Sequence, residues 1–179
     1  LEAPEREPCT LPVVAQTLAG EPTVRDADRA LGDWITAHAG MLQWFDDWHG
    51  TWPDGQGGKE AFSANYGYAM LLGEHALGVT SRLESGLMTM GPGLIYPSHA
   101  HPAVELYIIL KGTSWWSIGD GPWQVRRPGD VFLHPSWVAH ATHTMDEPIL
   151  AAYFWSGDMS GPSAMTGRLL PDPRDPVSE

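Results

Sequence analysis

Short apolar runs separated by glycine and proline fill the chain from Gly78 to Trp155. The runs are rich in β-branched and aromatic residues, which favours strands over helices. The breaks between them carry turn signals such as Lys111-Gly112 and Pro128-Gly129-Asp130. Many short strands joined by tight turns predict an antiparallel sandwich or barrel, of which the jelly roll is one form. The expected strands are 79–90, 104–110, 113–118, 123–126, 131–133, 139–145 and 149–155.

The residues before this region follow a helical period instead. Apolar residues recur at helical spacing in 24–48, where Gly50 and Pro53 would stop the helix, and again in 59–76. After Trp155 the chain is rich in Pro, Gly and Asp, which is typical of a segment that wraps around a domain or frays. We therefore expect a helical extension packed on the barrel at residues 1–77, the barrel at 78–157 and a C-terminal tail at 158–179.

Composition narrows the range of partners. The formal net charge of -12 disfavours phosphate backbones and anionic membrane surfaces, so neither nucleic acid nor a membrane is expected as a partner. No apolar run approaches the roughly 20 residues of a membrane-spanning helix, and the polar first ten residues do not resemble a signal peptide. The single cysteine, Cys9, excludes an internal disulfide and fits a reducing compartment, so we expect a cytoplasmic protein.

One segment that ends at Tyr107 concentrates metal-binding chemistry. It holds His99, His101 and Glu105 within seven residues, and imidazole with carboxylate suits divalent transition metals. Because side chains alternate across an extended strand, these residues and Tyr107 would share one face, although Pro102 can bend the chain there. The opposite face is uniformly apolar and would face a core of its own. Spacing alone leaves open a polar outer face of an edge strand.

The spacing also matches a known family. Gly93, His99, His101, Glu105 and Gly112 stand at every position of the first motif of the cupin family. The resemblance implies a mainly β fold, a cupin jelly-roll β-barrel with an N-terminal helical extension. It also implies a second motif that faces the first inside the barrel and supplies one more histidine.

The second motif is less regular. Pro128-Gly129-Asp130 followed by His140 resembles it, whereas Thr144 stands where the family usually has Asn. His134 and His143 are rivals of His140; His143 would lie on the opposite face of an extended strand, and His134 could support a ligand from behind. The ligand set that the resemblance implies is His99, His101, Glu105 and His140, around a divalent transition metal that could be Zn, Fe, Mn, Ni or Co.

The stretch from Tyr96 to Trp155 is more specifically similar to the cupin-type dimethylsulfoniopropionate lyases of marine bacteria, particularly the Q type. The shared features are Tyr96 before the first histidine, the run His-Pro-Ala-Val-Glu-Leu-Tyr that ends at Tyr107, and Pro-Ser-Trp before His140. The resemblance implies a small-molecule substrate, dimethylsulfoniopropionate, and its cleavage to dimethyl sulfide and acrylate by β-elimination.

That reaction needs a base for the proton next to the carboxylate. A phenol beside a bound cation becomes more acidic, so a tyrosine could serve; Tyr107 is the first candidate and Tyr96 the second. In the family, the tyrosine at the position of Tyr107 is linked to metal contact and proton abstraction. The alternative for either residue is a core aromatic whose hydroxyl is satisfied. Aromatic faces bind sulfonium cations, and the substrate-binding candidates are Tyr96, Tyr107, Tyr153 and Trp155, with Trp48 and Trp52 as further possibilities.

Two other functions remain open at this stage. A metal-dependent dioxygenase would use the same ligands but would consume oxygen, and a non-catalytic cupin would bind a small ligand without turnover. Cupins are often dimers, so a homodimer is possible, with the helical extension as a pairing surface.

Overall fold

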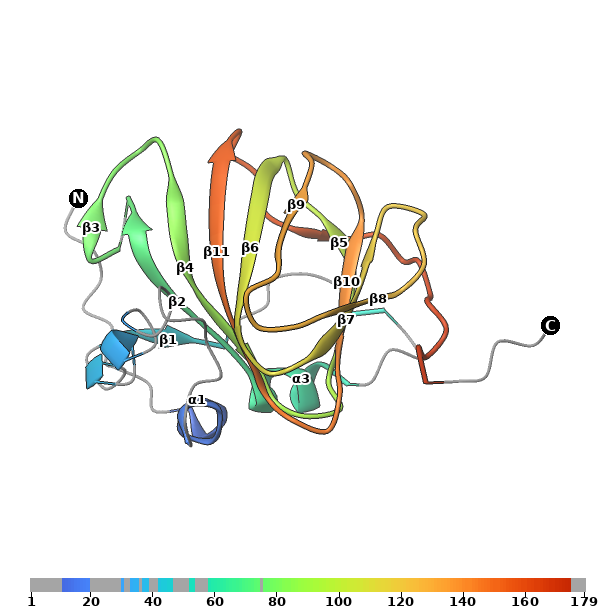
Figure 1. Cartoon of the computed structure of the whole chain (residues 1–179). Helices are drawn as coiled ribbons and strands as arrows, with labels where there is room; N and C mark the ends of the chain where they lie inside the picture. Colours follow the sequence, from blue (N-terminus) through green and yellow to red (C-terminus); the bar gives the residue numbers. More distant parts are fainter. Residues whose placement is uncertain are drawn as a thin grey trace.

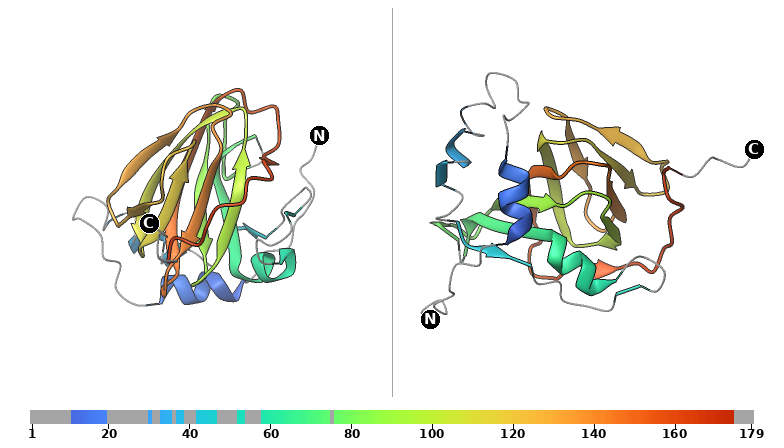
Figure 2. Two further views of the ribbon diagram at one scale, coloured as in Figure 1. Left: turned by 90° about the vertical axis from the view of Figure 1, so that its right-hand side faces the viewer. Right: turned by 90° about the horizontal axis from the view of Figure 1, so that it is seen from below.

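The computed structural model describes residues 11–19, 30, 33–35, 37–38, 42–46, 52–53, 58–74 and 76–174. They form two β-sheets that face each other, with α1 (Pro12–Leu18) and α3 (Lys59–Asn65) at one end of the barrel (Figure 1 and Figure 2). No helix within these ranges has the length and apolar character that crossing a membrane requires.

Neighbouring strands are antiparallel except where β3 pairs with β2. The larger sheet has the order β1-β2-β4-β11-β6-β9, with β3 beside β2, and the smaller sheet has the order β12-β5-β10-β7-β8. The larger sheet consists of β1 (Trp44–Phe45), β2 (Tyr66–Gly73), β3 (Gly78–Val79), β4 (Glu84–Met90), β6 (Ala103–Lys111), β9 (Val131–His134) and β11 (Ile149–Gly157). The smaller sheet consists of β5 (Ile95–Ala100), β7 (Ser114–Ile118), β8 (Gln124–Arg126), β10 (His140–Thr144) and β12 (Ala164–Met165).

Alternation along the strands of the larger sheet builds two separate cores. In β6, Tyr107 and Ile109 point into the barrel, whereas Ile108 and Leu110 pack on the outer face. The strands β4 and β11 divide their side chains in the same way. The outer core is covered by α1, whose Val13 is buried there. The inner face of β6 is buried throughout, whereas its apolar outer face is buried at Leu110 and only partly buried at Val104, Leu106 and Ile108.

Polar contacts hold α1 in place over the sheet. The hydroxyls of Thr17 and Thr89 lie 2.6 Å apart. The ammonium group of Lys111, at the end of β6, donates to the carbonyl oxygens of Thr17 and Ala19, each over 2.6 Å. A cation on the last carbonyls of a helix also interacts favourably with the helix dipole.

The helix predicted for 59–76 is correct only in its first half. α3 ends at Asn65, and the next eight residues form β2, which pairs with β4. The run Tyr-Gly-Tyr-Ala-Met-Leu-Leu-Gly is apolar almost throughout, and such a run does not distinguish a strand from a helix by its period. The aromatic residues favoured the strand, and the two glycines disfavoured the helix. The barrel therefore begins before residue 78, within the region assigned to the helical extension.

The helix predicted for 24–48 ends earlier than expected. Residues 30, 33–35 and 37–38 are helical, but Trp44 and Phe45 form β1 and pair with Ala69 and Tyr68 of β2. The edge of β2 offers unpaired backbone groups, and pairing with it satisfies them. Trp48 lies outside the described residues.

The remaining strands agree closely with the prediction. The expected run 79–90 is interrupted, because a turn separates β3 from β4, and the strands β6 to β11 lie where they were expected to within a few residues. Besides β1 and β2, two further strands were not on the expected list, β5 and β12. Since β12 pairs with β5, the C-terminal segment wraps around the barrel and joins the smaller sheet.

The segment from His99 to Tyr107 is not one extended strand, and it bends at Pro102, where the sequence allowed a bend. The chain leaves the smaller sheet after Ala100 and enters the larger sheet at Ala103. Pro102 lies between the two strands, where it has no N–H to give to a ladder. His99 and Glu105 therefore come from opposite sheets, and the residues predicted to share one face belong instead to two walls of the barrel.

Candidate metal centre and active site

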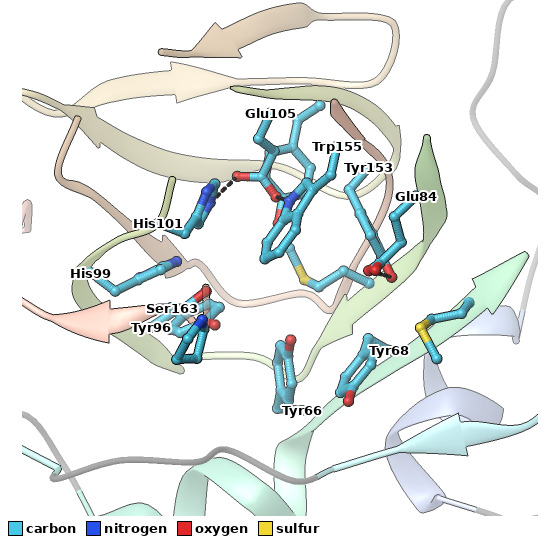
Figure 3. Close-up of a pocket in the computed structure, with 14 residues that line it drawn as sticks. Tyr66, Tyr68, Glu84, Tyr96, His99, His101, Glu105, Tyr153, Trp155 and Ser163 are labelled. Atoms are coloured by element: carbon cyan, nitrogen blue, oxygen red, sulfur yellow. Dashed lines mark hydrogen bonds and ion pairs between the residues drawn. The ribbon is translucent and has the colours of Figure 1, made fainter. Parts of the chain in front are cut away.

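A cavity of about 290 Å³ opens between the two sheets (Figure 3). All five tyrosines of the chain line it, so the tyrosine content is concentrated at one place. No Lys or Arg is among the lining residues. They are Tyr66, Tyr68, Met70, Glu84, Met88, Tyr96, His99, His101, Glu105, Tyr107, Tyr153, Trp155, Pro162 and Ser163.

Glu105 is the centre of a buried polar cluster at one side of this cavity. Its Oε2 lies 3.2 Å from Nε2 of His101, 2.9 Å from Nδ1 of His134 and 3.5 Å from Nε2 of His140. Its Oε1 accepts the indole N–H of Trp155 over 2.6 Å. Burial alone would raise the pKa of Glu105, but the contacts with His101 and His134 hold that pKa well below its usual range. The carboxylate is therefore ionised among imidazole rings.

Local backbone bonds fix which nitrogen each histidine presents. Nδ1 of His99, His101 and His140 lies 2.8, 3.1 and 2.9 Å from the carbonyl oxygens of Pro97, Ala103 and Val138, each two residues away. A carbonyl only accepts, so Nδ1 carries the proton in each ring, and a neutral ring then presents a lone pair on Nε2. The backbone conformation of the two motifs thus leaves Nε2 of three imidazoles available to bind a metal ion.

The cluster therefore brings lone pairs toward a carboxylate. Burial lowers the pKa of His140 well below its usual value, and the neighbouring His99 and His134 lower it further. Burial also lowers the pKa of His99 to about 4. Both rings are neutral near pH 7, and Nε2 of His140 has no hydrogen-bond partner among the described residues. Imidazole lone pairs and a carboxylate oxygen that face one another with no hydrogen between them are suited to binding one cation together.

The ligand atoms of His101, Glu105 and His140 all lie within 4.8 Å of one another, and all three residues are buried. These residues could hold a metal ion. His99 does not belong to that group. It lies next to it, because His99 pairs with His140 across β5 and β10 and their ring centroids are 4.2 Å apart. The ring of Tyr96 stacks on His99 with centroids 4.0 Å apart.

The comparisons with known proteins bear on this arrangement. The model of the dimethylsulfoniopropionate lyase family matches residues 3–151 of the chain. The chain belongs to this family. The dimethylsulfoniopropionate lyase DddQ of Ruegeria pomeroyi is 30% identical over 159 residues, which are 89% of this chain and 77% of that protein.

Solved structures of dimethylsulfoniopropionate lyases agree. The crystal structure of DddQ from Ruegeria pomeroyi matches with a TM-score of 0.75 and 28% identity, over 93% of this chain and 85% of that one. A structure from the work on the lyases RdDddP and RnDddQII matches with a TM-score of 0.75 and 25% identity, over 91% and 82% of the two chains. The jelly-roll fold expected from the sequence is thereby confirmed.

The rival histidines in this lyase-family site have different positions. His134 stands opposite Glu105 in the pairing of β9 with β6, and its ring stacks on that of His140 with centroids 3.9 Å apart. Because a carboxylate only accepts, His134 donates its Nδ1–H and supports Glu105 from behind. His143 is buried but does not line the cavity, and neither ring nitrogen has a hydrogen-bond partner within the described part of the chain.

The tyrosines predicted as bases both reach the cavity. Tyr107 packs against Trp116 and His134, with ring centroids 4.8 and 5.5 Å apart. Burial raises the pKa of Tyr107 well above its usual value, and the charge of Glu105 raises it further. Burial is also the main reason that the pKa of Tyr96 is raised. Without a neighbouring positive charge, both phenols stay protonated.

Not all of the aromatic residues predicted to contact the substrate line the cavity. Tyr153 and Trp155 line the cavity, as expected for a wall that receives a cation. Trp52 does not line it and packs on Phe62 instead, with centroids 4.8 Å apart. The hydrogen bond from Trp155 to Glu105 gives this residue a polar contact that the sequence did not predict.

Sequence reasoning missed one wall of the cavity. Tyr66, Tyr68 and Met70 line it from β2, and their spacing of two residues was the available signal of a strand face. Reading this segment as a helix concealed it. Glu84, at the start of β4, was also missed, and a single acidic residue within the predicted strand 79–90 gives no signal of its own.

Proposed function

We propose that this chain cleaves dimethylsulfoniopropionate into dimethyl sulfide and acrylate by base-catalysed β-elimination. The observation that carries the proposal is the buried Glu105 with the Nε2 atoms of His101 and His140 turned toward it, at one side of a cavity lined by five tyrosines. Membership of the lyase family supports the substrate and the reaction. The fold alone would not, because it hosts many chemistries.

A divalent transition metal fits the cluster. His101, Glu105 and His140 would hold it, with His99 as the fourth ligand, and Zn, Fe, Mn, Ni and Co all suit this set. Such an ion, when bound, supplies Lewis acidity for the substrate carboxylate and for the charge that develops beside it. The hydrogen bonds from His134 and Trp155 to Glu105 keep the carboxylate oriented for this role.

Tyr107 is proposed as the base. Its phenolate oxygen takes the proton from the carbon next to the substrate carboxylate. The electron pair of that C–H bond forms the double bond of acrylate, and the C–S pair leaves with sulfur as neutral dimethyl sulfide. The raised pKa of Tyr107 means that the phenolate requires a compensating positive charge nearby. Tyr96, stacked on His99, is the second candidate.

The sulfonium end is proposed to lie on the aromatic walls. Tyr96, Tyr107, Tyr153 and Trp155 all line the cavity, and their ring faces can hold a methylated cation without competing for the metal. Tyr66 and Tyr68 extend this surface from β2. The cavity volume of about 290 Å³ is appropriate for a small zwitterion.

Gas chromatography of purified protein with dimethylsulfoniopropionate tests the proposal. We expect dimethyl sulfide and acrylate in equal amounts, without oxygen consumption, with loss of activity on chelation and recovery on addition of a divalent metal. Oxygen uptake without acrylate would favour the dioxygenase. Tight binding of the substrate without either product would favour the non-catalytic cupin. A cytoplasmic location and a homodimer remain predictions.

A further inference from the structure

The cavity has a second acidic residue that the elimination itself does not require. Glu84 lies at the start of β4, is partly buried and lines the cavity. The hydroxyl of Tyr153 donates to its carboxylate over 3.4 Å. Within the described ranges no Lys or Arg forms an ion pair with it. Figure 3 shows Glu84 and Tyr153 on the side of the cavity away from His99.

The sheet fixes the position of Glu84 relative to the buried polar cluster around Glu105. On β11, Trp155 stands opposite Glu84 of β4 and opposite Glu105 of β6. The two carboxylates therefore come from strands on either side of β11, at the same level of the sheet. Two strand spacings place their backbones about 10 Å apart, and Trp155 lies between them on the middle strand.

A glycine makes this arrangement possible. Gly86 stands opposite Tyr153, and a Cβ there would lie 2.7 Å from the hydroxyl oxygen of Tyr153. Only a residue without a side chain lets the ring lie across β4 so that its hydroxyl reaches Glu84. The packing of the Tyr153 ring over Gly86 thus fixes the position of the Glu84 carboxylate.

Charge indicates what the carboxylate is for. Burial raises the pKa of Glu84, the hydrogen bond from Tyr153 opposes this, and the negative charge of Glu105 adds to the rise. An ionised Glu84 without a cation is therefore unfavourable in the free protein. A ligand that brings a fixed positive charge to this side of the cavity compensates this cost.

We propose that Glu84 is a specificity-determining residue that binds the cationic head of a zwitterionic carboxylate. It selects this ligand over carboxylates of the same shape whose head carries no charge. This rests on the proposed function for the identity of the natural substrate. The aromatic ring faces also favour a charged head, and the carboxylate of Glu84 adds a full negative charge to that preference.

Two unreactive probes of equal shape test this by calorimetry on the metal-loaded protein. One is 3-(trimethylammonio)propanoate, and the other is 4,4-dimethylpentanoate, in which carbon replaces the charged nitrogen. We expect the unmodified protein to bind the charged probe at least about tenfold more tightly. Glu84→Gln should lose most of this preference by weakening the charged probe alone, and Glu84→Asp should keep part of it.

Matched measurements separate charge from folding. Glu74→Gln removes one negative charge from an exposed residue that directly follows β2, the strand paired with β4. This variant should leave the preference unchanged. With dimethylsulfoniopropionate, Glu84→Gln should raise KM about tenfold with little change in kcat. Inhibition by acrylate, which has no cation, should not change.

The outcomes distinguish this proposal from the proposed function. Equal binding of the two probes by the unmodified protein, or an unchanged preference in a folded Glu84→Gln protein, would overturn the role of Glu84 even if dimethyl sulfide is released. A preference that disappears in Glu84→Gln would support that role even if no dimethyl sulfide is released, in which case the substrate would be a different onium carboxylate.

Discussion

Trp155 and Glu105 stand directly opposite each other on β11 and β6, and the indole N–H of Trp155 donates to Oε1 of Glu105 over 2.6 Å. This hydrogen bond links an aromatic residue of the cavity wall to Glu105, the centre of the buried polar cluster. It leaves Oε2 to the three histidines. One cross-strand pair therefore links the candidate metal site to the aromatic wall that is proposed to receive the substrate.

Trp155→Phe keeps an aromatic ring and removes this hydrogen bond. Because groups that orient a metal ligand contribute to affinity, we expect divalent-metal affinity to fall by about 10- to 100-fold. Titration calorimetry against a chelator measures it. Trp123→Phe is the matched control, since its indole N–H bonds the carbonyl of Pro171 outside the cavity. Equal metal affinity in the two variants would show that the Trp155 bond does not orient Glu105.

His134→Phe separates a supporting residue from a ligand. The variant keeps a ring against His140 but cannot donate to Oε2 of Glu105. We expect metal affinity to fall by about 10- to 100-fold while one ion per chain still binds at saturation. His140→Phe should abolish that stoichiometry. Elemental analysis after dialysis measures both, and complete loss in His134→Phe would make His134 a ligand itself.

Tyr107→Phe tests the base. Removing one hydroxyl should lower kcat by about 10²- to 10⁴-fold without changing metal content, because general-base catalysis is worth that much. Tyr96→Phe should have a smaller effect on kcat. Dimethyl sulfide release measured under substrate saturation gives both values. The opposite order of the two variants would transfer the role to Tyr96.

Glu84→Gln has a predicted effect on stability as well as on binding. A glutamate in the unfolded chain ionises near pH 4.3, whereas burial raises the pKa of Glu84 in the folded protein. The unfolded chain therefore loses this proton first, and folding stability falls as pH rises between the two values. Gln carries no such cost.

The melting temperature of Glu84→Gln should therefore exceed that of the unmodified protein at neutral pH, and the two should converge below about pH 4. Calorimetric scans at both pH values of the ligand-free protein measure the difference. A variant that is less stable at neutral pH would show that Glu84 already has a compensating partner in the folded protein.

The sequence was sufficient to predict the strands from β6 to β11 and most of the cluster. His101, Glu105 and His140 lie together as expected, because the two motifs place them on strands that meet across a small barrel. What could not be predicted was the route of the chain between them. Parity placed His99 and Glu105 on one face, whereas the bend at Pro102 sends them to opposite sheets.

The far wall of the cavity was beyond the reach of pattern reasoning for a different reason. The period of 66–73 was ambiguous, and the pairing of β2 with β4, a tertiary contact, decided it. Once β2 is read as a helix, the positions of Tyr66, Tyr68 and Glu84 relative to the histidines cannot be derived. The interaction of Tyr153 with Glu84 depends in turn on the absent side chain of Gly86.

Pro162 and Ser163 give the C-terminal segment a place in the cavity wall, and Met165 of β12 pairs with His99 of β5. Every candidate ligand and both candidate bases precede this segment in the chain. During synthesis on the ribosome, the histidines and Glu105 thus emerge well before the strand that borders His99. The cavity wall is completed by the C-terminal segment, the last part of the barrel to be translated.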